Sequence, residues 1–194
     1  MIQPPPVSLE KPGAGLPVLE LLFARHLMMP FLSRTRSWDE SYRRFLGSGE
    51  KILEYTSDLN KGKMERQVLI PRLPGLEDSS RFWSVAMTLE HLTIAGNTTS
   101  GIIVELSHDR IPPLRLEITQ VKPFANDANE SRRAFQAMLK TASTRLLREV
   151  KNRSSKARLR HPWFGPITAR EWNCLIAFHQ DLHFRQIRQI IKRL

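Results

Sequence analysis

One segment near the end of the chain, residues 168–191, places its apolar side chains at the three-and-four-residue spacing of a single helix face. Thr168 and Glu171 stand three residues apart at its start, which is the sequence of a capping box. A long helix with one apolar face must bury that face against other elements, so the segment predicts a helical domain. The face consists of Trp172, Leu175, Ile176, His179, His183, Ile187 and Ile190.

An earlier helix is predicted from a second capping box, which begins at Ser37. Its apolar stripe continues to about residue 60. Gly47 and Gly49 lie in its middle, where each costs about 1 kcal/mol relative to alanine.

Two more helices complete the set. Asp78 or Ser79 offers an N-cap for the second helix, and Asn129 offers one for the third. Four principal helices predict an all-α, antiparallel four-helix bundle with its core in residues 37–194. The stripes of the second and third helices contain Trp83, Met87, His91, Ile94, Phe135, Met138, Ala142, Leu146 and Val150.

Three segments fall outside this bundle pattern. Residues 1–15 are rich in proline and glycine, including Pro4, Pro5 and Pro6, and predict a flexible lead-in to a single domain over residues 16–194. Residues 16–32 predict an extra N-terminal amphipathic helix, too short and too charged to span a membrane, that packs on the domain or on a partner or lies on a membrane surface. Helical periodicity fades over residues 102–124, which predicts a loop or short hairpin inserted between helices 2 and 3.

Composition indicates an ordinary globular protein. Hydrophobic residues make up 41% and charged residues 25% of the 194 residues, so neither disorder nor a transmembrane segment is expected. The lone Cys174 excludes an internal disulfide and a cysteine-rich zinc site. The first residues lack the basic region and apolar core of a secretory signal, so we expect a cytoplasmic protein.

The formal net charge of +11 is concentrated near the C-terminus. Residues 140–194 carry thirteen Lys and Arg against three Asp and Glu, a balance of +10. This basic half indicates either a solvated surface that favours anionic small molecules or a site for nucleic acid or an acidic partner. No aromatic residue interleaves the basic run between Phe135 and Trp163, which disfavours base stacking on single strands.

Three histidines form a candidate metal site. His179 and His183 are four residues apart on one helix face, and His91 lies on the stripe of another helix. Buried histidines lose their charged form and need a partner, so two on one apolar stripe favour a ligand over ordinary core packing. If the two helices are neighbours, three neutral imidazoles can hold a divalent metal and leave positions open for chemistry.

A rigid segment just before the last helix is the candidate substrate-binding region. His161 is followed by Pro162, so Trp163 and Phe164 can wall a pocket while His161 reaches a substrate anion, or the two aromatic side chains simply cover the end of the bundle. Cys174 lies about 140° from His179 around the helix and is not expected to be a nucleophile.

No carboxylate base for hydrolysis is evident from spacing, so the catalytic residues stay unassigned. Glu90 lies about 100° from His91 and Asp181 about 160° from His179 around their helices. A loop carboxylate such as Asp109 or Asp127 remains an alternative.

With its three histidines, the stretch from Arg81 to His91 and the stretch from His161 to Trp172, the chain resembles the DinB-like metal-binding four-helix bundle superfamily over residues 37–194. The resemblance implies an up-down-down-up bundle, frequently a homodimer, with zinc or nickel on His91, His179 and His183. It also implies thiol S-transfer from a low-molecular-weight thiol to a small electrophile, although many members have no known activity. A metal-dependent hydrolase and a non-enzymatic binding module remain the alternatives. The N-terminal helix, the insertion and the basic linker depart from the pattern.

Overall fold

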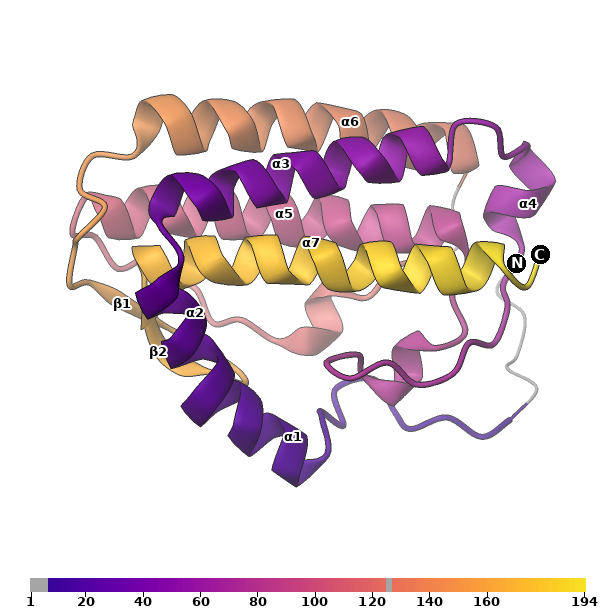
Figure 1. The fold of residues 1–194 in the computed structure, drawn as a ribbon, viewed down its shortest axis with the longest axis horizontal. Coiled ribbons are helices and arrows are strands. Elements are labelled where there is room, and N and C mark those ends of the chain that lie inside the picture. Colours follow the sequence, from indigo (N-terminus) through magenta and orange to yellow (C-terminus); the bar gives the residue numbers. More distant parts are fainter. Residues whose placement is uncertain (1–6, 125–126) are drawn as a thin grey trace.

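The computed structural model describes residues 7–124 and 127–194, so Pro4, Pro5 and Pro6 of the expected lead-in lie outside the described residues. Four long helices pack side by side, as Figure 1 shows. They are α3 (Trp38–Tyr55), α5 (Val85–Ser107), α6 (Ala128–Thr144) and α7 (Ala169–Ile191). The predicted class, a mainly helical protein built on a four-helix bundle, is confirmed.

The four helices do not simply alternate in direction. Helices α3 and α6 run antiparallel, with Tyr42 Oη 2.8 Å from Ser143 Oγ, and so do α5 and α7 (Figure 1). Helices α3 and α7 run parallel, with Ser41 Oγ 3.4 Å from Cys174 Sγ. Helices α5 and α6 are also parallel neighbours. The four helices therefore follow an up-down-down-up order, in which two neighbouring pairs are antiparallel and two are parallel.

The long connection between α5 and α6 explains this order. A short loop forces consecutive helices to be antiparallel, whereas here residues 108–124 return along the bundle, so that α6 starts at the same end as α5. This connection contains one 3-10 turn, η3 (Ile118–Val121), and no strand among its described residues. It is a loop, and the hairpin alternative is wrong.

Helix α5 starts later and ends later than its sequence indicated. Its N-cap is Ser84, which accepts a hydrogen bond from the Met87 amide at 3.1 Å, while Asp78–Ser80 form a separate 3-10 turn, η2. At its other end the helix continues to Ser107. Ile102, Ile103, Val104 and Leu106 are all buried there, so the sequence shows no one-sided stripe where the helix is surrounded.

The sequence predicted the starts of the other three long helices more closely. Ser37 accepts a hydrogen bond from the Glu40 amide at 3.0 Å, and Thr168 and Glu171 form a complete capping box. Helix α6 is capped by Asp127, two residues before the expected Asn129, and a π-turn, η4 (Arg145–Glu149), extends it.

A two-stranded hairpin precedes α7 where a basic linker was expected. Strand β1 (Arg158–His161) pairs antiparallel with β2 (Gly165–Thr168), with Leu159 opposite Ile167. Both of these side chains are buried, at 6% and 4% exposed. Strands of four residues are too short to show a convincing alternation in sequence.

Residues 18–35, before α3, are helical and pack on the side of the bundle (Figure 1). They consist of α1 (Val18–Phe23), a π-turn, η1 (Ala24–Met28), and α2 (Met29–Thr35), and they bury Ala24, Met29 and Leu32. A short helix, α4 (Lys61–Glu65), follows α3. Within the described part of the chain, none of the helices combines the length and apolar character needed to cross a bilayer.

The bundle core is formed by side chains from all four long helices. Its fully buried members include Phe45, Ile52, Leu89, Leu92, Ile103, Leu106, Phe135, Met138 and Ile187. Gly49 lies where α3 approaches α6, since a Cβ atom built there would stand 2.5 Å from Leu139 Cδ2. At Gly47 nothing lies within 4 Å of such an atom.

The two glycines therefore predict opposite effects of the same substitution. Gly47→Ala should raise the free energy of unfolding by about 1 kcal/mol, because alanine favours the helix. Gly49→Ala should lower it by about 1–3 kcal/mol, because the methyl group overpacks the contact with Leu139. Urea unfolding followed by circular dichroism measures both, and stabilisation by both substitutions would contradict the close approach of α3 and α6.

Candidate metal centre

The three predicted histidines come together between α5 and α7. His91 projects from α5 and His179 and His183 from α7, and one ring nitrogen of each lies within 4.8 Å of the others. The Nε2 atoms of His91 and His179 are 3.0 Å apart. Two nitrogens bound to one tetrahedral zinc at the usual distances are about 3.3 Å apart. The spacing of this pair is therefore close to that of two ligands on one ion.

Burial keeps these rings uncharged. His91 and His183 are only 6% and 3% exposed. Burial lowers the pKa of His91 to about 4 and that of His179 to about 3, and it lowers the pKa of His183 well below its ordinary value. At neutral pH each ring therefore carries a free lone pair, which is the form that binds metal.

In His91 and His183, a hydrogen bond at Nδ1 determines which ring nitrogen carries the proton and which keeps its lone pair. His91 Nδ1–H donates to the Val121 carbonyl oxygen at 2.6 Å. His183 Nδ1 lies 2.6 Å from Gln186 Oε1, and Gln186 Nε2 donates to the Ser80 carbonyl at 2.8 Å. The amide of Gln186 is thereby oriented to accept from His183. Both rings keep their proton on Nδ1 and leave the lone pair on Nε2, as metal-binding histidines commonly do.

His179 completes the metal-free arrangement. Because His91 Nε2 can only accept, His179 Nε2–H donates to it across the 3.0 Å contact. Trp83 packs over the group, with its ring nearly parallel to that of His183 at an interplanar angle of 9° and a centroid distance of 6.1 Å. The same indole lies 5.1 Å from the His91 ring. The rings are thus held by hydrogen bonds on one side and by an aromatic surface on the other.

A buried ion pair that the sequence did not reveal lies beside the histidines. Glu77 is 3% exposed and pairs with Lys122, whose ammonium lies 5.4 Å from the centre of the Trp83 ring. Burial raises the pKa of Glu77, but the hydrogen bond from Lys122 and the Gly15 amide outweigh it, and the net shift is downward. Both residues lie in loops without periodicity, so no spacing rule could place them next to helix residues.

The other carboxylates considered from the sequence form hydrogen bonds or ion pairs with other parts of the protein. Glu90 accepts from the Phe124 amide, and Asp181 bonds to Ser48. Asp109 accepts from Ser155, and Asp127 caps α6 and pairs with Lys61. Neither loop aspartate is delivered to the histidines. In the described part of the chain, Glu77 is the fully buried carboxylate of the cavity wall, and Lys122 holds it ionised.

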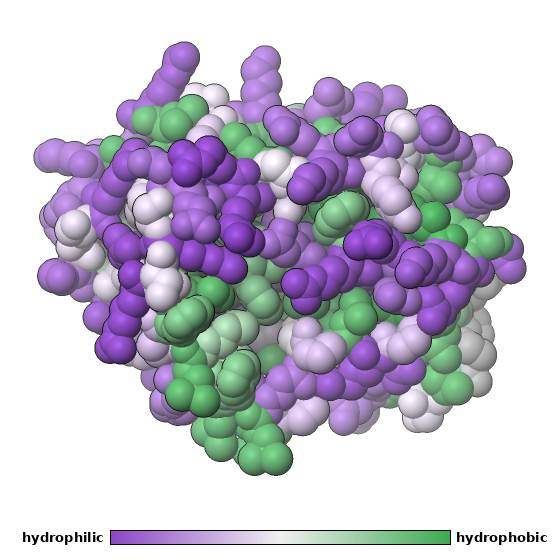
Figure 2. Space-filling model, viewed as in Figure 1, coloured by the Kyte–Doolittle hydropathy of each residue, from purple (hydrophilic) through white to green (hydrophobic). Residues whose placement is uncertain are grey.

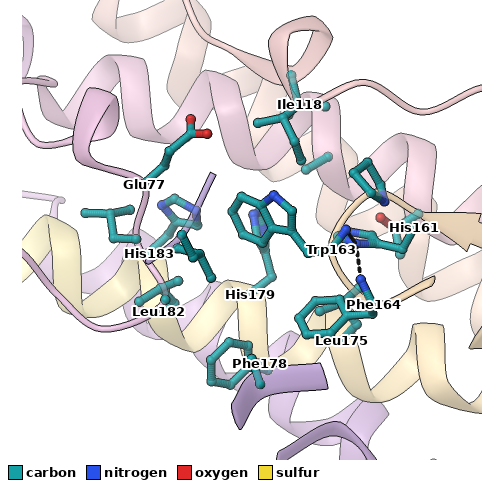
Figure 3. A pocket seen from close by; sticks show the side chains of 18 of the residues that line it. Glu77, Ile118, His161, Trp163, Phe164, Leu175, Phe178, His179, Leu182 and His183 are labelled. Carbon is teal, nitrogen blue, oxygen red and sulfur yellow. Dashed lines mark hydrogen bonds between the residues drawn. The ribbon is translucent and has the colours of Figure 1, made fainter. Parts of the chain in front are cut away.

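A cavity of about 300 Å³ adjoins the three histidines. Its walls are mostly apolar and come from α1, η1, η3, α5, α7 and the hairpin turn. His161, Trp163 and Phe164 line it, together with His91, His179 and His183, and Figure 3 shows most of these side chains around the space. The structure thus brings the sequence-derived substrate residues and the histidine cluster to one cavity.

His161 is oriented by the turn that follows it. Its Nδ1 accepts from the Trp163 amide at 3.1 Å, so the neutral ring carries its proton on Nε2. Burial, and next the nearby His179, lowers the pKa of His161 to about 3. The Trp172 indole N–H, in the same cavity wall, is buried without a partner among the described residues. Both side chains are donors that stay neutral at physiological pH.

Cys174 and the basic run do not take part in this cavity. Cys174 is 1% exposed, contacts Ser41, and has its pKa raised by burial. In the basic run, Arg145 donates to the Asn97 carbonyl and Arg153 pairs with Asp39. Arg158 lies 3.5 Å from Glu171. Several of these charges are therefore bound to the protein itself.

No protein-family model matches the chain, and no curated protein matches it. A solved structure described as TT2238, a four-helix bundle protein, matches with a TM-score of 0.52 at 20% sequence identity. The match covers 78% of this chain and 98% of that one. At this identity the likeness shows the fold alone, and the fold it shows is the four-helix bundle.

The depressed histidine pKa values predict that the metal-free protein loses stability in acid. Below pH 6.5 the histidines of the unfolded chain become protonated, whereas those of the folded protein stay neutral to lower pH. The free energy of unfolding therefore falls as the pH falls. For His91, whose folded pKa is about 4, the loss is on the order of 3 kcal/mol by that pH. Urea unfolding with a chelator, from pH 7 to 4, measures it. His91→Gln should show a shallower pH dependence, and identical slopes would contradict this assignment.

Proposed function

We propose that this chain is a DinB-like, divalent-metal-binding protein whose ligands are His91, His179 and His183. The observation that carries the proposal is the convergence of three neutral imidazoles, of which His91 and His183 are buried and already hydrogen-bonded through Nδ1. Three nitrogen ligands without cysteine suit zinc or nickel. Such a set leaves at least one coordination position for a further ligand.

We further propose thiol S-transfer to a small electrophile as the activity. A divalent metal held by three neutral ligands would keep its full charge and would lower the pKa of a low-molecular-weight thiol that binds there. The thiolate sulfur bonds to an electrophilic carbon while the bond from that carbon to its leaving group breaks, and the thiol proton passes to solvent. The mostly apolar cavity supports an uncharged or aromatic acceptor as the second substrate.

His161, Trp163 and Phe164 are the proposed substrate-binding residues. His161 Nε2–H can donate to an oxygen of the acceptor, because Nδ1 is already occupied by the turn amides. Trp163 and Phe164 supply apolar wall beside it. The neutral state of His161 suits a hydrogen-bond donor better than a charged anchor for an anion.

Two alternatives receive less support. Hydrolysis requires a carboxylate free to accept a proton from water, and Glu77 is instead paired with Lys122. Nucleic-acid binding requires a free basic surface, and Arg145, Arg153 and Arg158 contact the protein itself. The resemblance further supports a homodimer, which sedimentation velocity tests. The cytoplasmic location expected from the sequence is tested by fractionation.

Metal binding is tested by calorimetric titration of chelator-treated protein, prepared without a histidine tag, with zinc and nickel salts. We expect one ion per chain, and a loss of affinity of at least about 100-fold in His91→Gln, His179→Gln and His183→Gln. Gln186→Leu, which removes the acceptor of His183 Nδ1–H, should cost about 10–100-fold. The exposed His26→Gln is the control. Equal affinity in the control and the His179 variant would contradict the site.

Thiol transfer is tested with metal-loaded protein, glutathione or another cellular thiol, and a chlorinated nitroaromatic acceptor. We expect a thioether conjugate and released chloride, with neither formed by His179→Gln. His161→Phe should raise KM for the acceptor by about threefold to tenfold while metal content stays unchanged, because one hydrogen bond is lost. Turnover without any thiol would favour hydrolysis, and no turnover with any thiol would discard the transferase.

A further inference from the structure

The N-terminal helical stretch from Val18 to Thr35 presents an apolar face to solvent. Six large apolar side chains lie on it, and each is 47–83% exposed. They are half of the twelve exposed large hydrophobic residues in the described part of the chain. We name them the apolar face: Val18, Leu19, Leu22, Phe23, Leu27 and Phe31. Figure 2 shows apolar surface gathered where this stretch protrudes from the bundle.

The π-turn keeps this face continuous. Leu19, Phe23, Leu27 and Phe31 follow one another at four-residue steps, and in a regular α-helix each such step drifts by about 40° around the axis. The wider turn at Ala24–Met28 takes back part of that drift. All four side chains therefore face solvent over the whole stretch, while Met29 and Leu32 face the bundle.

The stretch that carries the apolar face is basic in sequence, and its Arg34 is exposed. Arg25, His26, Arg34 and Arg36 belong to residues 16–36, in which Glu20 is the one acidic residue. Glu20 turns inward to Arg72 and the Gly75 amide. The Arg25 guanidinium also lies against Gly165, so the hairpin with exposed Arg160 is adjacent. The outward charge of this part of the molecule is positive.

We propose that the apolar face docks on an anionic lipid bilayer. Apolar side chains on a helix with basic flanks are the features that seat a helix in the interface of an anionic membrane. The positive charge beside the face also favours a lipid surface over a second copy of the chain as the binding partner. A symmetric dimer through the same face would bring basic flanks together on two molecules of net charge +11, whereas lipid phosphates attract them.

The docking surface borders the cavity but does not depend on a metal. Phe23 is 56% exposed and also lines the cavity, so the two features meet at this residue. Lipid binding is therefore measured in the presence of a chelator. A failure of lipid binding then leaves the metal proposal intact, and a failure of metal binding leaves the lipid proposal intact.

The test is flotation with vesicles of phosphatidylcholine alone and of phosphatidylcholine containing about one third phosphatidylglycerol. The face variant is Leu19→Glu, Leu27→Glu and Phe31→Glu combined. The control variant, Ile111→Glu, Leu114→Glu and Leu147→Glu combined, adds the same charge at side chains of 62%, 42% and 57% exposure away from the face. Circular dichroism melting establishes that both variants fold.

We expect the natural chain to float with the anionic vesicles and to bind them less well in high salt. The face variant should lose binding by roughly tenfold or more, and the control variant should stay within about twofold. No binding to the anionic vesicles would overturn the proposal, as would equal losses in both variants. Light scattering that shows a dimer converted to monomer by the face variant would assign the face to a second copy instead.

Discussion

The packing of α5 against α7 is the contact on which the candidate site depends. These helices run antiparallel as neighbours, so His91 on one meets His179 and His183 on the other. The two α7 histidines share one helix face because they are four residues apart. The third histidine, His91, needs a correct register between two helices far apart in the sequence. That register is set by the bundle core, in which Leu89, Leu92 and Ile187 are fully buried.

The candidate site also depends on the long connection between α5 and α6, which supplies contacts to His91 and Trp83. Because α6 runs parallel to α5, the chain must return along the bundle, and it does so past the histidines. In this connection the Val121 carbonyl accepts a hydrogen bond from His91 Nδ1–H, and the Lys122 ammonium lies beside Trp83. The topology of the bundle thus delivers the outer hydrogen bond that selects the His91 tautomer. The segment that interrupted the helical pattern is part of the site.

Sequence periodicity predicted the helices well where one face is buried and poorly where a helix is surrounded. Thr168 and Ser37 marked true helix starts, while the end of α5 was missed because Ile102 to Leu106 are buried on several sides. The shared face of His179 and His183 was predictable because side chains four residues apart on a helix lie together. Glu77 and Lys122 were not, since loop residues reach a site through tertiary contacts that leave no period in the sequence.

The central claim is that three imidazoles share one ion, and X-ray absorption at the zinc edge tests it most directly. Protein purified without a histidine tag and loaded with one equivalent of zinc should show three nitrogen neighbours at about 2.0–2.1 Å, with the outer-shell scattering of imidazole rings. The His91→Gln variant should lose one of the three. A first shell of oxygen alone, or a shell unchanged in that variant, would contradict the account.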